Sequence, residues 1–248
     1  MKKIVISLML CFSVGAQAAK QCSVDIKNEV HLDGHQVEIV QPDASKVLID
    51  QDNNVFINGE KLDLNQAQID AIESYREHMN KYVPQVLDIA RDGLELAQNA
   101  LDEIAVSFNN SEAFNSVKEA LEEFFNGMAQ RYQKDEQFIL QEAAFSDAVA
   151  TWKEDFAAAR ETFNAEFFSS AFTAISEQMN AEGGLNLTEL KDKLVELQAN
   201  LTTKLEADSK EIEKDAKQYC GDLEAVAEEE KMLHEKIPEL KDYQVFLI

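Results

Sequence analysis

Helix-breaking residues are scarce in this sequence, whose 248 residues include only eight glycines and three prolines. Glycine and proline interrupt helices more strongly than any other residues, so their scarcity excludes a chain of many short elements joined by tight turns. It predicts long helices with few connections. Gly34, Pro42 and Gly59 lie near the N-terminal end, and that region is expected to fold differently from the rest.

Basic residues are also in deficit, with 23 Lys and Arg against 47 Asp and Glu and a formal net charge of −24. Nucleic-acid phosphates need basic side chains for neutralisation, and anionic membrane surfaces attract basic segments. The charge therefore argues against both as partners. It fits a well-solvated surface, a cationic partner or loose binding of divalent cations.

The first eighteen residues have the layout of a secretory signal peptide. Lys2 and Lys3 form a basic start, residues 4–14 are apolar, and an Ala-Gln-Ala cleavage site ends at Ala18. Cleavage before Ala19 would remove the two lysines, change the charge from −24 to −26, and leave a soluble periplasmic protein. No later stretch is apolar for about 18 residues, so no second membrane segment is expected.

Residues 19–64 are predicted to form a small antiparallel β-meander of four or five strands. Over residues 22–32 apolar side chains take the even positions and polar ones the odd, a period of two broken only at Asn28. Residues 47–49 and 55–57 are short β-branched runs that predict two further strands.

Two dipeptides are typical of two-residue type I′ hairpin turns, Asp-Gly at 33–34 and Asn-Gly at 58–59. The first turn would pair Leu32 with His35. In both hairpins the apolar face would continue across the turn, so pattern and register support each other.

Residues 65–237 are predicted to form long antiparallel amphipathic helices. Asn65 and Gln68 stand at the positions of a capping box, and Pro84 is expected to kink the first helix or to separate it from the next. A heptad seam over residues 87–108 calls for a packed partner helix.

Large apolar side chains are concentrated in the middle of the chain, because eleven of the fourteen phenylalanines lie between 108 and 172. Such a stripe of Phe and Trp is expected to be core, with a held lipid or unfolded client as the alternative. Residues 182–184 predict a helix stop before a last long helix, and residues 238–248 read as a strand-like tail that could return to the sheet. The predicted fold class is α+β, mostly α.

Two cysteines, Cys22 and Cys220, remain after the signal and its Cys11 are removed. An even count in an oxidising compartment predicts a disulfide between them. It would tie the first strand to the last long helix and make residues 19–248 one unit. The pair is not a C-x-x-C motif, so a redox-catalytic role is not expected.

The common catalytic and phosphate-binding motifs are absent from the sequence, and we expect no catalytic residue and no cofactor. His31 and His35 with Asp33 could suggest a metal site, but the predicted register sends the two histidines to opposite faces, so no metal is expected. Glu230 and His234 are one helical turn apart, a spacing expected of a surface pair.

Runs of acidic residues are the remaining candidates for acid–base chemistry. With 47 acids in the chain, adjacency arises by chance, so residues 122–123 and 228–230 are expected on solvated helix faces.

A set of segments spread over both ends of the mature chain resembles the YggN-like family of exported gammaproteobacterial proteins, a domain of unknown function. The segments are residues 22–25, 55–59, 62–65, 82–84, Cys220 and residues 237–246. The resemblance implies a periplasmic location and a shared fold, and it implies no catalytic residue, substrate or cofactor.

These observations predict a non-enzymatic periplasmic binding or scaffolding protein. Its partner would be an envelope client held through apolar contacts, as a chaperone does, or a basic protein; pairing of two copies through the helix seams is a further option. The alternative is a hydrolase whose site assembles only on folding. A buried carboxylate or histidine with a strongly shifted pKa in a concave pocket would favour that alternative.

The disulfide gives the first testable prediction. Mass spectrometry of protein from its native compartment should show Cys22 joined to Cys220 and a mature chain that starts near Ala19. Closing a loop of about two hundred residues stabilises by up to about 5 kcal/mol in the chain-entropy model, so Cys220→Ser should lower the melting temperature. Two alkylatable thiols on the unreduced, unfolded chain would refute the pairing.

Overall fold

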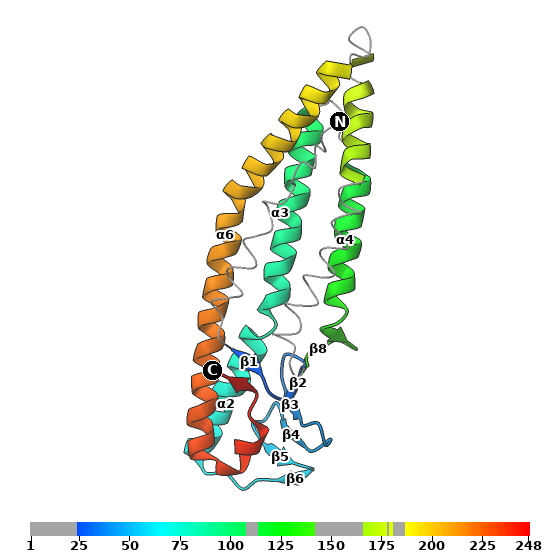
Figure 1. The fold of residues 1–248 in the computed structure, drawn as a ribbon. Helices are drawn as coiled ribbons and strands as arrows, with labels where there is room; N and C mark the ends of the chain where they lie inside the picture. The colour runs from blue at the N-terminus through cyan, green and yellow to red at the C-terminus, as the bar shows by residue number, and fades with distance from the viewer. Residues whose placement is uncertain (1–23, 108–113, 142–165, 178, 181–186) are drawn as a thin grey trace. The chain divides into compact units, whose positions relative to one another are not determined.

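A computed structural model describes residues 24–107, 114–141, 166–177, 179–180 and 187–248 of the chain (Figure 1). The predicted signal peptide with Ala18 and Ala19, Cys22, the helix stop at 182–184 and most of the later Phe and Trp stripe lie outside these residues. The described residues confirm the predicted fold class, since antiparallel strands near the N-terminal end are followed by long helices.

The chain divides into two compact units, each built from separate stretches of sequence. Within the described residues, the sheet unit combines 24–88, 127–141 and 215–248, whereas the helical unit combines 89–107, 114–126, 166–180 without 178, and 187–214.

The strands are short and the helices long. The strands are β1 (Asp25–Ile26), β2 (Glu29–Leu32), β3 (Val37–Val40), β4 (Lys46–Ile49), β5 (Val55–Ile57), β6 (Glu60–Lys61), β7 (Gln133–Lys134), β8 (Gln137–Leu140) and β9 (Phe246–Leu247). The helices are α2 (Gln66–Tyr82), α3 (Gln85–Ser107), α4 (Asn115–Ala129), α6 (Leu187–Lys236) and the 3₁₀ helix η1 (Pro238–Tyr243), and residues 166–177 are also helical.

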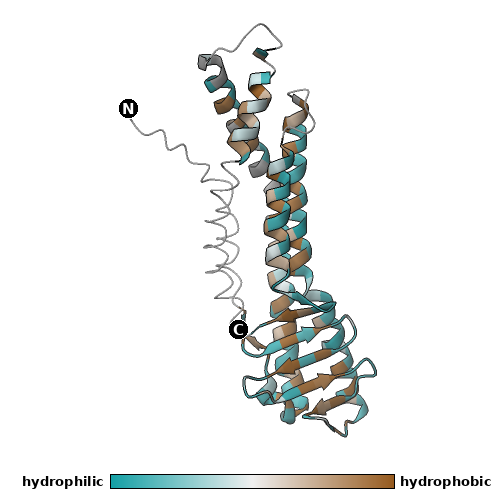
Figure 2. Cartoon of the chain, turned by 90° about the vertical axis from the view of Figure 1, so that its right-hand side faces the viewer, coloured by the Kyte–Doolittle hydropathy of each residue, from teal (hydrophilic) through white to brown (hydrophobic). Residues whose placement is uncertain are grey.

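Seven strands form one antiparallel sheet in the order β6-β5-β4-β3-β2-β8-β7. The stretch β2 to β6 is the predicted meander of five strands. Alternate residues of β2, β3 and β4 are buried, as the period of two requires, and these strands carry the hydrophobic colour in Figure 2. One face of the sheet therefore belongs to the core of the unit.

The predicted two-residue turn at 33–34 is wrong. Leu32 pairs with Val37 rather than His35, so the connection is a four-residue loop over 33–36. The Asp33 carboxylate accepts the backbone N–H groups of His35 and Gln36 at 2.8 and 2.7 Å, which closes the wider loop. The slip is two residues, so the buried face is the predicted one.

Helix α2 also holds this loop open. The Asn80 side chain accepts the Gly34 N–H at 2.8 Å and donates to the Gln36 carbonyl at 3.1 Å. Arg76 donates to the His35 carbonyl at 2.9 Å. These contacts come from a helix more than forty residues further along the chain, and for that reason local turn chemistry did not reveal them.

The second predicted turn is confirmed. Ile57 pairs with Glu60 across Asn58 and Gly59, whose φ angles of 50° and 87° are those of a type I′ turn. The Leu62 N–H donates to the Val55 carbonyl at 2.8 Å, as the predicted register requires.

A hairpin outside the meander, β7–β8, interrupts the region 65–237 that was predicted to be helical throughout. β8 pairs with β2, so this hairpin extends the sheet beyond the N-terminal meander. Its two-residue turn is Asp135-Glu136, with φ angles of 50° and 66°. The sequence prediction missed the hairpin because neither turn residue is a glycine.

The C-terminal tail does return to the N-terminal strands, but it pairs outside the seven-stranded sheet. β9 and β1 form a separate two-stranded sheet in which Ile26 pairs with Phe246. The chain passes from β1 to β2 at Asn28, the residue that breaks the period of two. Asn28 is buried and donates to the Gln244 carbonyl at 2.7 Å.

The predicted capping box at Asn65 and the predicted separation of two helices at Pro84 are both confirmed. Asn65 is the N-cap of α2, and Gln68 completes a capping box with it. Pro84 lies between the end of α2 and the start of α3. Ile72, Tyr75 and Met79 of α2 are buried within the sheet unit.

The helical unit has its own hydrophobic core. Phe114 stacks on Phe167, with ring centroids 5.5 Å apart, between α4 and helix 166–177. The other buried members of this cluster are Ala100, Leu101, Ile104, Ala105, Val117, Ala171, Ile175, Met179, Leu197 and Leu201. No helix in the described ranges combines the length and the apolar composition needed to cross a bilayer.

The turn at 58–59 supplies a prediction about stability. At Gly59 the backbone has a φ of +87°, so Gly59→Ala should lower the free energy of unfolding by about 1 kcal/mol although no neighbouring atom crowds the new methyl group. Gly93→Ala on α3 is the matched control. It meets open space at an ordinary helical φ and should raise stability by up to about 1 kcal/mol. Urea denaturation measures both changes, and equal effects of the two would contradict the assigned turn.

Candidate functional site

Two neighbouring carboxylates on α6, those of Glu229 and Glu230, accept hydrogen bonds from side chains of α2 and form a polar cluster in the sheet unit. Glu230 was expected in a surface pair with His234 and on a solvated face, and both expectations are wrong, because its exposed fraction is 2%. The apolar seam of α6 explains the burial. Leu223, Val226 and Leu233 are buried at steps of three and seven, and position 230 divides the longer step into four and three on the same seam.

The Glu230 carboxylate accepts three hydrogen bonds. Its Oε1 accepts from the Tyr75 hydroxyl at 3.0 Å and from the Val245 N–H at 2.7 Å. Its Oε2 accepts from the Phe246 N–H at 2.9 Å. One side chain therefore joins α6 to α2 and to the strand β9.

Burial raises the pKa of Glu230 to about 7, because the ionised carboxylate loses its water. The two backbone N–H groups, the Tyr75 hydroxyl and the charge of Lys27 act in the opposite direction and lower it. Burial, followed by the negative charge of Glu230, also raises the pKa of Tyr75 well above its usual value, so this phenol stays a proton donor.

Glu229 organises a second set of groups. Its Oε1 accepts from the Ser74 hydroxyl at 2.5 Å and its Oε2 lies 2.7 Å from His78 Nδ1. Ser74 and His78 are four residues apart on one face of α2. A serine nucleophile needs its hydroxyl bonded to the imidazole base, whereas here the carboxylate stands between the two. The arrangement therefore fits a structural cluster rather than a catalytic triad.

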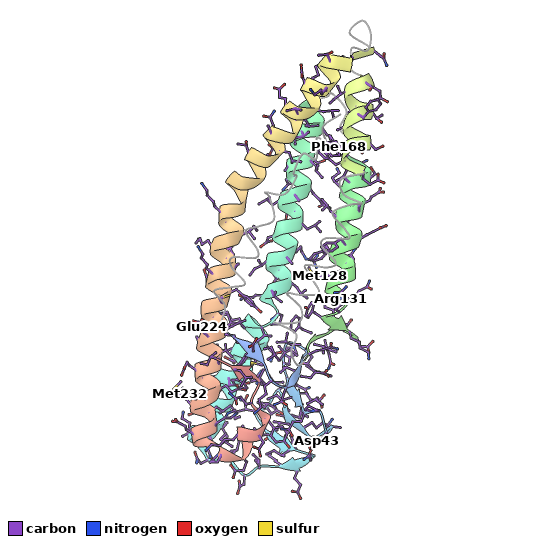
Figure 3. The ribbon with its side chains drawn as sticks, in the orientation of Figure 1. Asp43, Met128, Arg131, Phe168, Glu224 and Met232 are labelled. Atoms are coloured by element: carbon purple, nitrogen blue, oxygen red, sulfur yellow. The ribbon has the colours of Figure 1, made fainter. Side chains whose placement is uncertain are left out.

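A depression of about 370 Å³ lies beside Glu229, between α2 and α6. The small side chains of Ala67 and Ala71 line it on the α2 side. Met232, labelled in Figure 3, also lines it and has an exposed fraction of 56%. The remaining lining residues are Asp70, Ser74, Leu233 and Lys236. Glu230 is not among them, so the group with the raised pKa does not open into this depression.

A larger depression, of about 630 Å³, lies between the 33–36 loop, the β4–β5 connection and α2. Arg76 and Lys81 are the basic residues that line it, and the Arg76 guanidinium already donates to the Asn53 side chain and to the His35 carbonyl. Asp52 and Glu77 line the same space, so no single charge dominates it.

The histidines proposed for a metal site do not come together as one. His31 faces two glutamates, with Nε2 2.6 Å from Glu29 Oε1 and Nδ1 3.7 Å from Glu38 Oε2. His35 lies exposed in the four-residue loop, so the prediction that a tight hairpin sends it to the opposite face is wrong. Across the described ranges, no group of three or more His, Cys, Asp or Glu side chains is placed to hold a metal ion.

The acidic pair on α4 and Cys220 are the other residues that the sequence analysis named. Glu122 and Glu123 are exposed on α4, as predicted. Cys220 is half-buried on α6, and its predicted partner Cys22 lies outside the described residues, so the pairing stays a prediction.

The helical unit exposes large apolar side chains at the edge of its core. Phe168, labelled in Figure 3, and Phe172 lie four residues apart on helix 166–177. Their exposed fractions are 40% and 49%. Phe167, Ala171 and Ile175 of the same helix are buried. At 3.6 residues per turn Phe168 and Phe172 lie directly beside this buried stripe, so the helix has one broad apolar face with a partly exposed edge.

The sequence matches a protein family of unknown function. The family model described as "Protein of unknown function (DUF2884)" matches residues 22–246, nearly the whole chain after the predicted signal. The chain belongs to this family. No curated protein and no solved structure gives a significant match.

Glu230 gives a prediction about stability. Glu230→Ala leaves the Tyr75 hydroxyl and two backbone N–H groups without their acceptor, and each unpaired buried donor costs about 1–3 kcal/mol. The free energy of unfolding should therefore fall by about 3 kcal/mol or more in urea denaturation. Glu228→Ala is the control, since Glu228 is exposed and makes only a surface ion pair with Lys231. A loss no larger than the control's would contradict the role assigned to Glu230.

Proposed function

We propose that this chain is a non-enzymatic periplasmic binding protein that belongs with the YggN-like exported proteins. Its helical unit would hold an apolar polypeptide segment of an envelope partner. The observation that carries this proposal is the exposed Phe168–Phe172 pair. Two phenylalanines one helical turn apart form the kind of anchor with which a helix face grips another chain.

The negative charge of the chain favours a neutral or basic partner over a second copy. Helix 166–177 carries Glu166 and Glu177 and no basic residue, and the whole chain has a formal net charge of −24. A second copy would bring an equally negative surface to the same face. A neutral or basic segment with large apolar side chains meets no such repulsion.

The hydrolase alternative draws support from one observation, the raised pKa of Glu230. A general acid or base must reach the substrate. Glu230 is 2% exposed, its two oxygens accept three internal donors, and it is absent from the lining of the neighbouring depression. We therefore assign it a structural role.

A binding measurement tests the proposal. The probe is a permanently unfolded protein, reduced and alkylated α-lactalbumin, and its fluorescence anisotropy reports binding to the purified mature chain. Phe168→Ser combined with Phe172→Ser should weaken binding at least tenfold, because both anchors lose their apolar surface. Met232→Ser should leave binding unchanged, since it removes an equally exposed apolar side chain from the sheet unit.

The salt dependence of binding distinguishes an apolar client from a basic partner protein. Holding by apolar contacts should survive an increase from 0.1 M to 1 M NaCl, which shortens the Debye length from about 10 Å to about 3 Å. A collapse of binding at 1 M salt, together with equal affinity of the double variant and the parent chain, would favour capture of a basic protein and contradict the assigned apolar face.

A further inference from the structure

The depression between α2 and α6 is formed by one face of each helix. Its residues stand at positions i, i+3, i+4 and i+7 of both helices, the spacing that places side chains on one helical face. They are Ala67, Asp70, Ala71 and Ser74 on α2 and Glu229, Met232, Leu233 and Lys236 on α6. The depression is therefore a groove that follows the contact between the two helices, and we call it the α2–α6 groove.

Hydrogen bonds between the two helices fix both ends of the groove. At one end the Gln68 side chain donates to the Lys236 carbonyl at 2.8 Å. At the other end the Ser74 hydroxyl donates to the Glu229 carboxylate at 2.5 Å. The helices are antiparallel here, and the Lys236 and Glu229 ends lie about 10 Å apart at a rise of 1.5 Å per residue. Because the chain's own bonds hold both ends, the groove is formed without a ligand.

The middle of the groove is apolar and accessible. On the α2 side Ala67 and Ala71 present only methyl groups, and on the α6 side Leu233 is 2% exposed while Met232 is 56% exposed. The volume of about 370 Å³ falls within the range of about 300–1,000 Å³ found for pockets that hold small ligands. An extended methylene chain laid in this groove would contact apolar atoms of both helices.

Two carboxylates line the groove against one ammonium group. Glu229 Oε2 lies 2.7 Å from His78 Nδ1, and Asp70 Oδ1 accepts from the Gln66 amide at 2.8 Å. A carboxylate offers about four acceptor positions, so both acids can accept a further donor. Lys236 stands at the end of the groove opposite Glu229, and the Glu229 end is therefore the one that favours a cation.

We propose that the α2–α6 groove binds the side chain of a lysine or arginine from a polypeptide partner. The aliphatic stem lies against the apolar middle and the cationic head meets the carboxylates of Asp70 and Glu229, since long cationic side chains cover apolar surface with their stems and keep their charge in polar surroundings. The formal net charge of −24 attracts a basic partner over longer distances. Met232 is exposed, so the groove opens to solvent and the partner's backbone can pass over it.

Methyl NMR of the whole mature chain, labelled with ¹³C at the methionine methyl groups, tests the proposal. Met232 lines the groove, and Met232→Leu identifies its signal. The probes are acetyl-lysine methylamide, acetyl-arginine methylamide and acetyl-norleucine methylamide, of which the last keeps an aliphatic stem and lacks the charge. Both cationic probes should shift the Met232 signal saturably, with dissociation constants on the order of 1 mM. The norleucine probe should bind about fivefold more weakly, because it forms no ion pair.

Three variants separate the groove from the general charge of the chain. Asp70→Asn changes an exposed residue and should weaken the binding of both cationic probes about threefold. Ala71→Leu fills the middle of the groove and should abolish the saturable shift. Glu228→Gln is the matched control, because it removes the same charge from an exposed position of α6 that does not line the groove, and it should bind like the parent chain.

The measurements can overturn the proposal in several ways. A Met232 signal that does not move, equal affinities of the lysine and norleucine probes, or equal effects of Asp70→Asn and Glu228→Gln would each do so. Butylamine carries the lysine stem and ammonium without a backbone, and its tighter binding would assign the groove to free amines instead of a polypeptide. None of these results depends on the Phe168–Phe172 pair, which belongs to the helical unit.

Discussion

The sheet unit depends on one buried carboxylate that serves three parts of the chain at once. Glu230 accepts from a side chain of α2 and from two backbone groups of the C-terminal segment, and it does so from the middle of the apolar seam of α6. A leucine at this position would pack as well against its neighbours, but it would leave three buried donors without a partner. The carboxylate thus specifies which segments meet.

The same contacts solve the problem of a free sheet edge. β9 has β1 on one side only, and a strand edge with open backbone groups invites pairing with another chain. On β9 the Phe246 N–H donates to Glu230, and the Phe246 carbonyl accepts from the Gln244 side chain at 2.6 Å. Side chains therefore occupy backbone groups that a neighbouring strand would otherwise claim.

Features set by near neighbours in sequence could be predicted, and most features set by distant contacts could not, the return of the C-terminal tail to the N-terminal strands being the exception. The Asn58-Gly59 turn and the Asn65 cap follow from the side chains at those positions. The 33–36 loop differs from its prediction because α2 binds its backbone. The Asp135-Glu136 turn was missed because acidic residues seldom adopt positive φ together. The strand β8 beside it pairs with β2, a contact distant in sequence.

The residues of the candidate site were also only partly predictable from the sequence. Composition and the absence of motifs predicted a binding protein and no binding-site residues. The acidic run alone does not distinguish Glu230 from Glu228. The apolar spacing of α6 does, since Glu230 continues the positions of Leu223, Val226 and Leu233. A charged residue at a seam position is expensive to bury, so it marks a place where the surroundings supply donors.

The pairing of β1 with β9 has a consequence for the order in which the molecule forms. Asp25 pairs with Leu247, so it obtains its strand partner from a residue 222 positions further along the chain. During synthesis β1 stays unpaired until residues 246–247 have been made, whereas the hairpins from β2 to β6 close over short separations. The meander can therefore form before the two-stranded sheet and before the hydrogen bonds of the buried carboxylate beside it.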